Sequence, residues 1–427
     1  NIKTIVNLMK RGNYIYASTE WDDLISKNEK YKQELQIMKT ITLEDKRTVL
    51  GKPLWDETVD MIIENPKYKL KQIEFYDTIM STDSKNVILK IDNPLLTDVI
   101  VGKTSEDPED AFNDYCFSSF AHQCLSPVYS KFCVRPISIR KIKQNEGQSK
   151  IVYFMKYIKG ENLQEYPELN RLNEKVMGQL YIFNKYLTKG YFFTGIDIKK
   201  SNIKEDFQNK FVKHLSLKAK RKFKDNLFNF SDFIWNYLNE MPRFVSNRDF
   251  HRGNIIYNEN EDLVCFIDNE KLFYETPCIS IGAYTQHLVG ESLGEDIEEI
   301  FNYYFRSLKK DRKRIFDINE KDFIKGCYFG AIFKNLEYAG LNSKVTMNIE
   351  DENVTFRNLN KVDLIKERHN YINQSRGVID RYINFNNVID SIERVKPLCN
   401  VKENHKLDRF SEILYEIKEI EEIELYQ

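Results

Sequence analysis

The residues most able to do chemistry lie in the stretch SNRDFHRGNIIYNENEDLVCFIDNE, residues 246–270. Two short apolar runs flank a polar turn there, which is the pattern of a β-hairpin. A hairpin brings its two ends together. Asp249 and Asn254 before the hairpin should therefore lie near Asp268 and Glu270 after it.

A carboxylate, an amide and a second carboxylate that converge in this way suit phosphoryl transfer. Asp249 can accept the proton of an attacking hydroxyl as a general base. Asn254 and Asp268 offer the hard oxygen ligands that Mg²⁺ prefers, and together they could hold the ion against nucleotide phosphates. His251 and Gly253 would shape the loop between them. The alternative is an ordinary polar hairpin whose Asp and Asn residues are turn formers.

The two ends of this stretch carry a family resemblance. D-F-H-R-G-N at 249–254 and I-D-N-E at 267–270 resemble the D-x-H-x-G-N and I-D-x-E motifs of the aminoglycoside phosphotransferase and choline kinase-like family. The resemblance implies an α+β, bilobal protein-kinase-like fold that transfers the γ-phosphate of ATP to a small-molecule hydroxyl, with Mg²⁺ as the metal. It makes Asp249, His251 and Asn254 the catalytic candidates, and Asn254, Asp268 and Glu270 the metal-binding candidates.

A small β-rich lobe is expected ahead of this stretch, because the pattern changes to short strands from about residue 72. The turn between the first two strands contains no glycine, so the glycine-rich phosphate loop of protein kinases is missing. That departure favours the small-molecule branch of the fold. The strands are expected at residues 73–80, 87–91, 99–103, 132–142 and 150–158.

A strand lysine is the next candidate. V-I-V-G-K places Lys103 at the end of a strand, and the resemblance implies that this lysine contacts the α- and β-phosphates. Lys90, in V-I-L-K-I, competes for the role, but an acidic helix predicted over 108–124 follows Lys103 directly. Glu109 and Asp114 are the two options for the carboxylate that pairs with the lysine.

A nucleotide-binding hinge is expected at residues 155–160. I-V-Y-F-M-K-Y-I-K-G-E-N-L resembles the family's strand ending in M-E-Y-I-x-G-x-x-L. The resemblance implies that the adenine edge pairs with backbone groups near Lys156 and Ile158, with Met155 behind the base. The alternative is a plain buried strand that turns at Gly160.

The predicted organisation is a helical N-terminal extension at 1–70, the small lobe at 71–158 and a helical large lobe at 159–427. Apolar residues recur every three or four positions through residues 172–187, which predicts one core-facing helix stripe. Further helices are expected at 293–308, 320–340, 358–384 and 407–425, and the last is amphipathic and should pack on the large lobe.

Two further stretches bear on the catalytic loop, one because it imitates such a loop and the other because it lacks an expected aspartate. D-I-K-K-S-N at 197–202 imitates the catalytic loop of protein kinases, but Asp206 comes soon after it with no strand pair between, so we interpret it as a lysine-rich surface turn. Ser280 or Gly282 stands where the family usually has the Asp of D-L-A, which steadies the catalytic loop. This departure implies either a less rigid loop or another residue that steadies it.

The composition limits the classes of partner that the protein is expected to bind. The 427 residues carry a balanced 30% of charged side chains with net charge −1, which argues against a general nucleic-acid binder. No apolar run is long enough to span a membrane, and no secretory signal opens the sequence. The seven cysteines form no C-x-x-C pair, so we expect buried free thiols and a cytoplasmic protein.

The function that fits these observations is ATP- and Mg²⁺-dependent phosphorylation of a hydroxyl on a sugar, amino alcohol or aminoglycoside-like molecule. The expected partners are ATP and this acceptor, without nucleic acid or membrane. An atypical protein kinase is one alternative, although no A-P-E motif occurs after Asp268. A non-catalytic nucleotide-binding scaffold on the same fold is the other.

Overall fold

The computed structural model describes residues 71–73, 88–91, 100–105, 108–125, 129–143, 149–163, 169–285, 297–347 and 384–426. The predicted N-terminal extension, most of the predicted first strand and nearly all of the predicted helix at 358–384 lie outside these ranges. The described chain divides into two compact units. The first includes the described residues up to Lys200, then Arg243–Glu275 and Asn302–Asp317.

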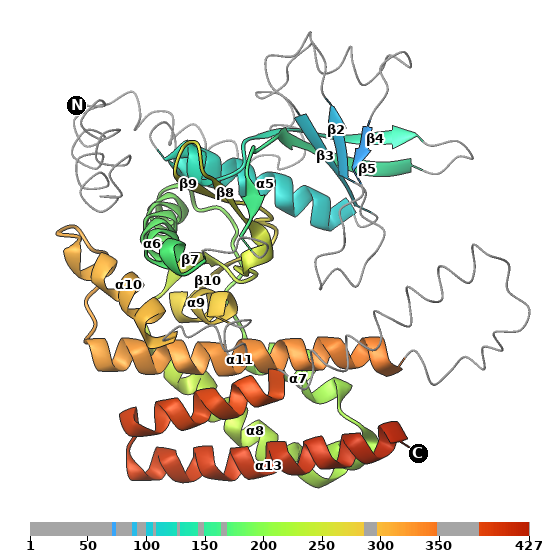
Figure 1. Ribbon diagram of the computed structural model, residues 1–427, viewed down its shortest axis with the longest axis vertical. Coiled ribbons are helices and arrows are strands. Elements are labelled where there is room, and N and C mark those ends of the chain that lie inside the picture. Colours follow the sequence, from blue (N-terminus) through green and yellow to red (C-terminus); the bar gives the residue numbers. More distant parts are fainter. Residues whose placement is uncertain are drawn as a thin grey trace, which may run out of the picture. The chain divides into compact units, whose positions relative to one another are not determined.

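The first unit begins with a five-stranded antiparallel sheet in the order β1-β2-β3-β5-β4. Helix α5 lies beside this sheet (Figure 1). The ring centroids of Tyr115 in α5 and Tyr153 in β5 lie 5.9 Å apart in an edge-to-face arrangement. The strands are β1 (Lys71–Ile73), β2 (Ile88–Ile91), β3 (Ile100–Ser105), β4 (Pro136–Lys143) and β5 (Ser149–Lys156), and α5 spans Pro108–Leu125.

Two boundaries in this sheet differ from the sequence prediction. The predicted strand at 132–142 starts later, because residues Ser130–Phe132 form a 3₁₀ turn, η1, and β4 begins only at Pro136. Strand β3 continues to Ser105, which pairs with Ile151 of β5. Lys103 therefore lies within its strand and not at the strand's end.

Helix α6 (Leu169–Thr194) is the scaffold on which the remaining strands of the first unit are held. The Gln179 amide donates to the Val264 carbonyl at 3.1 Å and accepts from the Val264 N–H at 3.2 Å. Thr188 Oγ1 accepts from the Val245 N–H at 2.8 Å. The predicted apolar stripe is confirmed as core, since Leu172, Val176, Leu180, Phe183 and Leu187 are all buried.

The strands that α6 holds form two small sheets. One pairs β7 (Phe244–Asn247) with β10 (Leu272–Glu275), and the other has the order β6-β8-β9. Strands β8 (Ile255–Asn258) and β9 (Leu263–Phe266) make the predicted hairpin, with Ile255 opposite Phe266. Strand β6 (Glu161–Asn162) joins the edge of β8. The short 3₁₀ turn η3 (Arg252–Asn254) precedes β8.

The second unit is helical. Helices α9 and α11 approach closely, because a Cβ on Gly330 would collide with the Cys278 carbonyl. Helix α8 contacts both α11 and α13 (Figure 1). The rings of Phe230 in α8 and Phe410 in α13 stack 3.4 Å apart. The helices are α7 (Ile203–Lys210), α8 (Leu217–Glu240), α9 (Pro277–Thr285), α11 (Glu320–Met347), a helix over 384–395 and α13 (Val401–Tyr426), and η2 (Val212–His214) and η5 (Lys396–Leu398) are 3₁₀ turns. Helix α10 (Ile297–Lys310) belongs to the second unit up to Phe301 and to the first from Asn302.

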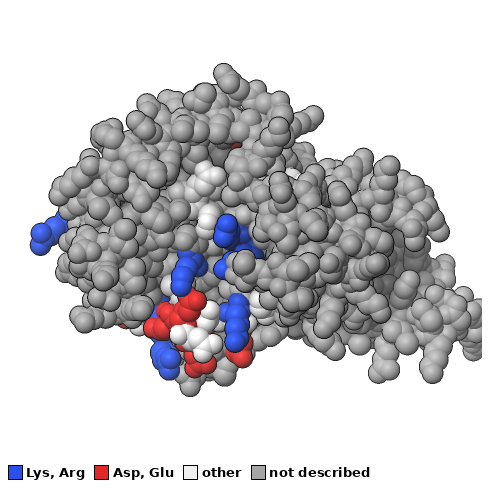
Figure 2. Space-filling model, turned by 90° about the horizontal axis from the view of Figure 1, so that it is seen from above, with Lys and Arg blue, Asp and Glu red and all other residues white. Residues whose placement is uncertain are grey.

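The apolar face of α13 is buried, which confirms that this helix packs within the protein. All seven cysteines are free, and six of them are buried, with Cys399 half-buried. Among the described helices, none is both long and apolar enough to cross a membrane. Figure 2 shows acidic and basic side chains intermixed in one small patch of the face it draws, in keeping with the balanced composition.

Candidate active site

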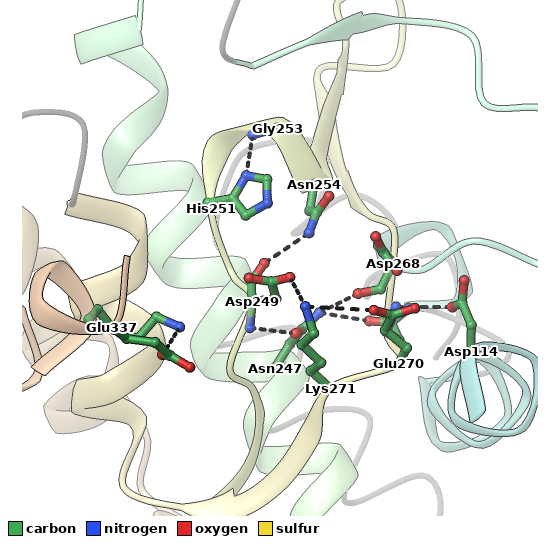
Figure 3. Close-up of polar contacts among 12 residues, drawn as sticks. Asp114, Asn247, Asp249, His251, Gly253, Asn254, Asp268, Glu270, Lys271 and Glu337 are labelled. Carbon is green, nitrogen blue, oxygen red and sulfur yellow. Dashed lines mark hydrogen bonds and ion pairs between the residues drawn. The ribbon is translucent and has the colours of Figure 1, made fainter. Parts of the chain in front are cut away.

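The loop after β7 is closed by its own polar groups (Figure 3). His251 Nδ1 accepts a hydrogen bond from the Gly253 N–H at 3.1 Å, and the His251 carbonyl accepts from the Asn254 N–H at 3.0 Å. The Asn254 amide nitrogen donates to the Asp249 carbonyl at 3.0 Å. These bonds explain why a histidine, a glycine and an asparagine come after Asp249 at this spacing: each supports the turn that presents the carboxylate.

The hairpin brings Asp268 back beside this loop. Asn254 immediately precedes β8, and its carbonyl accepts from the Ile267 N–H at 3.0 Å, just beyond the last residue of β9. Asp268 then adopts a left-handed backbone conformation with φ of 58°. A non-glycine residue held in this region is uncommon, and such residues cluster at functional sites. The expected convergence of Asn254 and Asp268 is therefore present in the fold.

The Lys103 side chain extends from β3 to the carboxylate of Asp268. Its Nζ lies 2.9 Å from Asp268 Oδ1, 3.2 Å from Asp114 Oδ2 and 3.7 Å from Glu270 Oε2. Burial alone would lower the pKa of Lys103, but the three carboxylates outweigh it and hold this pKa well above its usual value. Of the two carboxylates considered from the sequence, Asp114 makes this contact, whereas the Glu109 side chain lies outside the described residues.

The three carboxylates around Lys103 form a compact acidic cluster. Ligand oxygens of Asp114, Asp268 and Glu270 lie within 4.8 Å of one another. Burial, followed by the charge of Asp268, raises the pKa of Glu270 to about 7, and burial likewise raises the pKa of Asp114. Burial penalises the ionised form of both carboxyl groups, so a cation bound beside them would favour ionisation.

A divalent cation fits this charge balance. Asp249 and the acidic cluster present four carboxylates, which two ammonium groups, Lys103 and Lys271, contact. When all are ionised, two negative charges remain in excess. Oxygen ligands with this excess suit Mg²⁺. Asp268, Glu270 and the Asn254 amide oxygen are the groups that could hold the ion, since the Asn254 contact to Asp249 uses its amide nitrogen.

Asn247 was not anticipated from the sequence, and it ties the loop to the metal-binding candidate. Its side-chain oxygen accepts from the Asp249 N–H at 2.9 Å, while its amide nitrogen donates to the Asp268 carbonyl at 2.9 Å. The side chain is almost fully buried, so both bonds are shielded from water. One amide thus fixes the backbone of the candidate base and of Asp268 together.

Arg248 and Glu275 were also not anticipated from the sequence, and their ion pair joins the residue before Asp249 to strand β10. The Arg248 guanidinium donates to Glu275 Oε2 at 2.7 and 3.1 Å and lies 4.1 Å from the centre of the Phe273 ring. Both charged side chains are buried. A paired, buried arginine next to Asp249 anchors the loop to strand β10. The sequence gives little indication of this ion pair, because the two residues are brought together only by the pairing of β7 with β10.

The hinge candidates lie at the end of β5. Met155 is half-buried and packs against Tyr115 and Tyr153. The Lys156 N–H donates to the Arg135 carbonyl at 2.9 Å, and Ile158 lies in the irregular segment that follows β5. The chain then passes so close to β8 that a Cβ on Gly160 would collide with the Tyr257 carbonyl. Glycine is therefore required at this turn.

Comparison with solved structures identifies the fold. The chain is similar to a choline kinase from Cryptosporidium parvum Iowa II, with 11% identity, a TM-score of 0.52 and coverage of 81% of this chain and 94% of that one. It is also similar to a microcompartment-associated aminopropanol kinase, with 7% identity, a TM-score of 0.52 and coverage of 80% and 98%. No protein-family model matches the sequence, and no curated protein matches it either.

The chain has the protein-kinase-like fold of the aminoglycoside phosphotransferase and choline kinase type, a mixed α+β fold that is mostly helical. The fold predicted from the two motifs is confirmed. Small-molecule kinases share this fold. Similarity at this level of identity defines the architecture, and the chemistry has to be argued from the site.

Proposed function

We propose that this protein is an ATP- and Mg²⁺-dependent phosphotransferase that acts on a hydroxyl group of a small molecule. The observation that carries the proposal is the convergence of Lys103, Asp268 and the Asp249 loop, with Lys103 Nζ 2.9 Å from Asp268 and Asn247 joining Asp268 to Asp249. Phosphoryl transfer asks a protein mainly for positioning and charge stabilisation, and this arrangement suits both.

Each side chain has a proposed part. Asp249 accepts the proton of the acceptor hydroxyl, and Lys103, paired with Asp114, orients the phosphates. Asp268, Glu270 and Asn254 hold Mg²⁺, which when bound neutralises charge on the phosphates. Backbone groups near Lys156 and Ile158 bind adenine with Met155 behind it. The fold's similarity to a choline kinase and an aminopropanol kinase favours a small hydroxyl-bearing acceptor such as an amino alcohol.

Protein kinase activity is the weaker alternative on this fold. Strand β10 begins at Leu272 and α9 at Pro277, shortly after Asp268. That spacing leaves little room for the long activation segment with which protein kinases bind a peptide. A nucleotide-binding scaffold is the other alternative, and the retention of both Asp249 and Asp268 argues against it.

The experiment is an ATP-consumption screen of the purified protein with Mg²⁺, run in parallel on metabolite pools and on protein extracts. We expect phosphate transfer from ATP to a small molecule in the metabolite arm. Transfer confined to the protein arm would favour the protein kinase. Nucleotide binding without transfer in either arm would favour the scaffold.

A further inference from the structure

Lys271 is placed beside Asp249 by the backbone. It lies between Glu270 and the first residue of β10, and Leu272 pairs with Asn247 in the β7–β10 ladder. The Lys271 carbonyl accepts from the Arg248 N–H at 2.9 Å, one residue before Asp249. The strand pairing therefore fixes the position of Lys271 relative to the loop, independently of what its side chain does.

The side chain makes a second link to the same residue. Lys271 Nζ donates to Asp249 Oδ2 at 2.7 Å and lies 3.6 Å from Glu270 Oε1 (Figure 3). The Asp249 side chain is only 17% exposed, although that of Lys271 is 47% exposed. The ammonium thus stands between the candidate base and the acidic cluster, where two carboxylates would otherwise repel each other.

Two other cations near the loop, Arg248 and Lys103, have carboxylate partners of their own. Arg248 is buried against Glu275, and Lys103 is surrounded by Asp114, Asp268 and Glu270. Lys271 is the cation whose ammonium contacts both Asp249 and Glu270 among the ion pairs of the described residues. An isolated surface ion pair contributes about 0–1 kcal/mol to stability, so a purely structural role would be small.

We propose that Lys271 is a positioning residue for the phosphoryl transfer described above: it holds the Asp249 carboxylate in a fixed orientation and shields it from the charge of Glu270. This inference rests on the proposed function, since it concerns the same site. Misplacing a reacting group by about 1 Å can cost about 100-fold in rate. Loss of this contact should therefore lower turnover without lowering nucleotide affinity.

The test uses Mg-ATP with water as the phosphoryl acceptor, so that it does not depend on knowing the natural acceptor. The variants are Lys271→Met, Lys271→Arg, Asp249→Asn and the double variant Lys271→Met/Asp249→Asn. Lys131→Met is the matched control, because Lys131 contacts Glu261 at 2.5 Å outside the site. Single-turnover hydrolysis, the KM for ATP and the shift in melting temperature with Mg-ATP are measured for each.

We expect Lys271→Met to lower the hydrolysis rate by about 10–100-fold while leaving the KM for ATP and the Mg-ATP thermal shift close to those of wild type. Lys271→Arg should recover most of the rate, and Lys131→Met should keep all of it. The double variant should be no slower than Asp249→Asn, because Lys271 acts through Asp249.

Two results would overturn this inference without affecting the proposed function. The first is a Lys271→Met variant that keeps at least half of the wild-type hydrolysis rate. The second is a double variant whose loss of rate equals the product of the losses in Lys271→Met and Asp249→Asn. A wild-type protein that neither hydrolyses ATP nor shifts its melting temperature with Mg-ATP would overturn the proposed function, and the inference with it. The first pair of results requires an active wild type, so the two failures are distinguishable.

Discussion

Residues 197–202 and 249–254 both contain an aspartate with an asparagine five positions later, yet they do different things. Asp197 is exposed. Asn202 caps α7, since its side-chain oxygen accepts from the Glu205 N–H at 3.2 Å. Asn254, by contrast, donates to the Asp249 carbonyl and accepts, through its own carbonyl, from Ile267.

The difference lies in the element that begins after each asparagine. After Asn202 a helix begins, and its unsatisfied N–H groups use the amide as a cap. After Asn254 a strand begins, and the hairpin returns Asp268 to the loop. Spacing alone is therefore a poor guide to a catalytic loop. The next element along the chain decides whether the asparagine caps a helix or joins the loop to the hairpin.

The largest expected effect separates the two aspartates. Asp249→Asn keeps the shape of the side chain and removes its charge, so turnover on the identified acceptor should fall by about 10²–10⁴-fold with nucleotide affinity nearly unchanged. Asp197→Asn, the matched control, should retain the wild-type rate. Steady-state kinetics of both variants measures this, and full turnover by Asp249→Asn would show that Asp249 is not the base.

The two asparagines should differ in the kind of defect. Asn254→Ala removes a proposed metal ligand and a loop hydrogen bond, so it should raise the KM for Mg-ATP and lower the rate. Asn202→Ala should leave both constants unchanged but destabilise the protein by about 1 kcal/mol through loss of the helix cap. Kinetics together with denaturant unfolding distinguishes them, and equal kinetic defects in the two variants would contradict the contrast between the loops.

The same contrast extends to the two strand lysines. Lys103 contacts Asp268 and Asp114, whereas Lys90 lies opposite Val101 on the neighbouring strand. Lys103→Ala should therefore weaken ATP use more than Lys90→Ala does. ATP turnover across a range of nucleotide concentrations measures the ranking. The opposite order would transfer the phosphate-binding role to Lys90.

A smaller effect concerns pH. The pKa of Glu270 is raised from its usual 4.5 to about 7, so the metal-free folded state binds a proton that the unfolded state releases. The stability contributed by this group is fully present below about pH 4.5 and is lost as the pH rises through about 7, by at most about 3 kcal/mol. The difference in unfolding free energy, wild type minus Glu270→Gln, should therefore decrease as the pH rises from about 4.5 to about 7. A flat or rising difference would contradict the assignment.

The sequence was sufficient for those features that depend on local pattern. The hairpin, the apolar stripe of α6 and the aspartate before the loop can all be inferred from periodicity or from a motif, and the structure contains them. Asn247, Glu275 and Lys271 could not be found in this way. Their contacts depend on the pairing of β7 with β10, two short strands far apart in the chain with little signal of their own.

The central claim is that the site around the β8–β9 hairpin binds Mg²⁺ together with ATP, and thermal unfolding tests it most directly. Wild type should be stabilised by ATP plus Mg²⁺, by about 2.7 kcal/mol at a hundredfold excess over Kd. Asp268→Ala should lose the part of the shift that requires Mg²⁺, while keeping its melting temperature without nucleotide within a few degrees of wild type. No shift in wild type at millimolar ATP and Mg²⁺, or an equal Mg²⁺-dependent shift in Asp268→Ala, would contradict the claim.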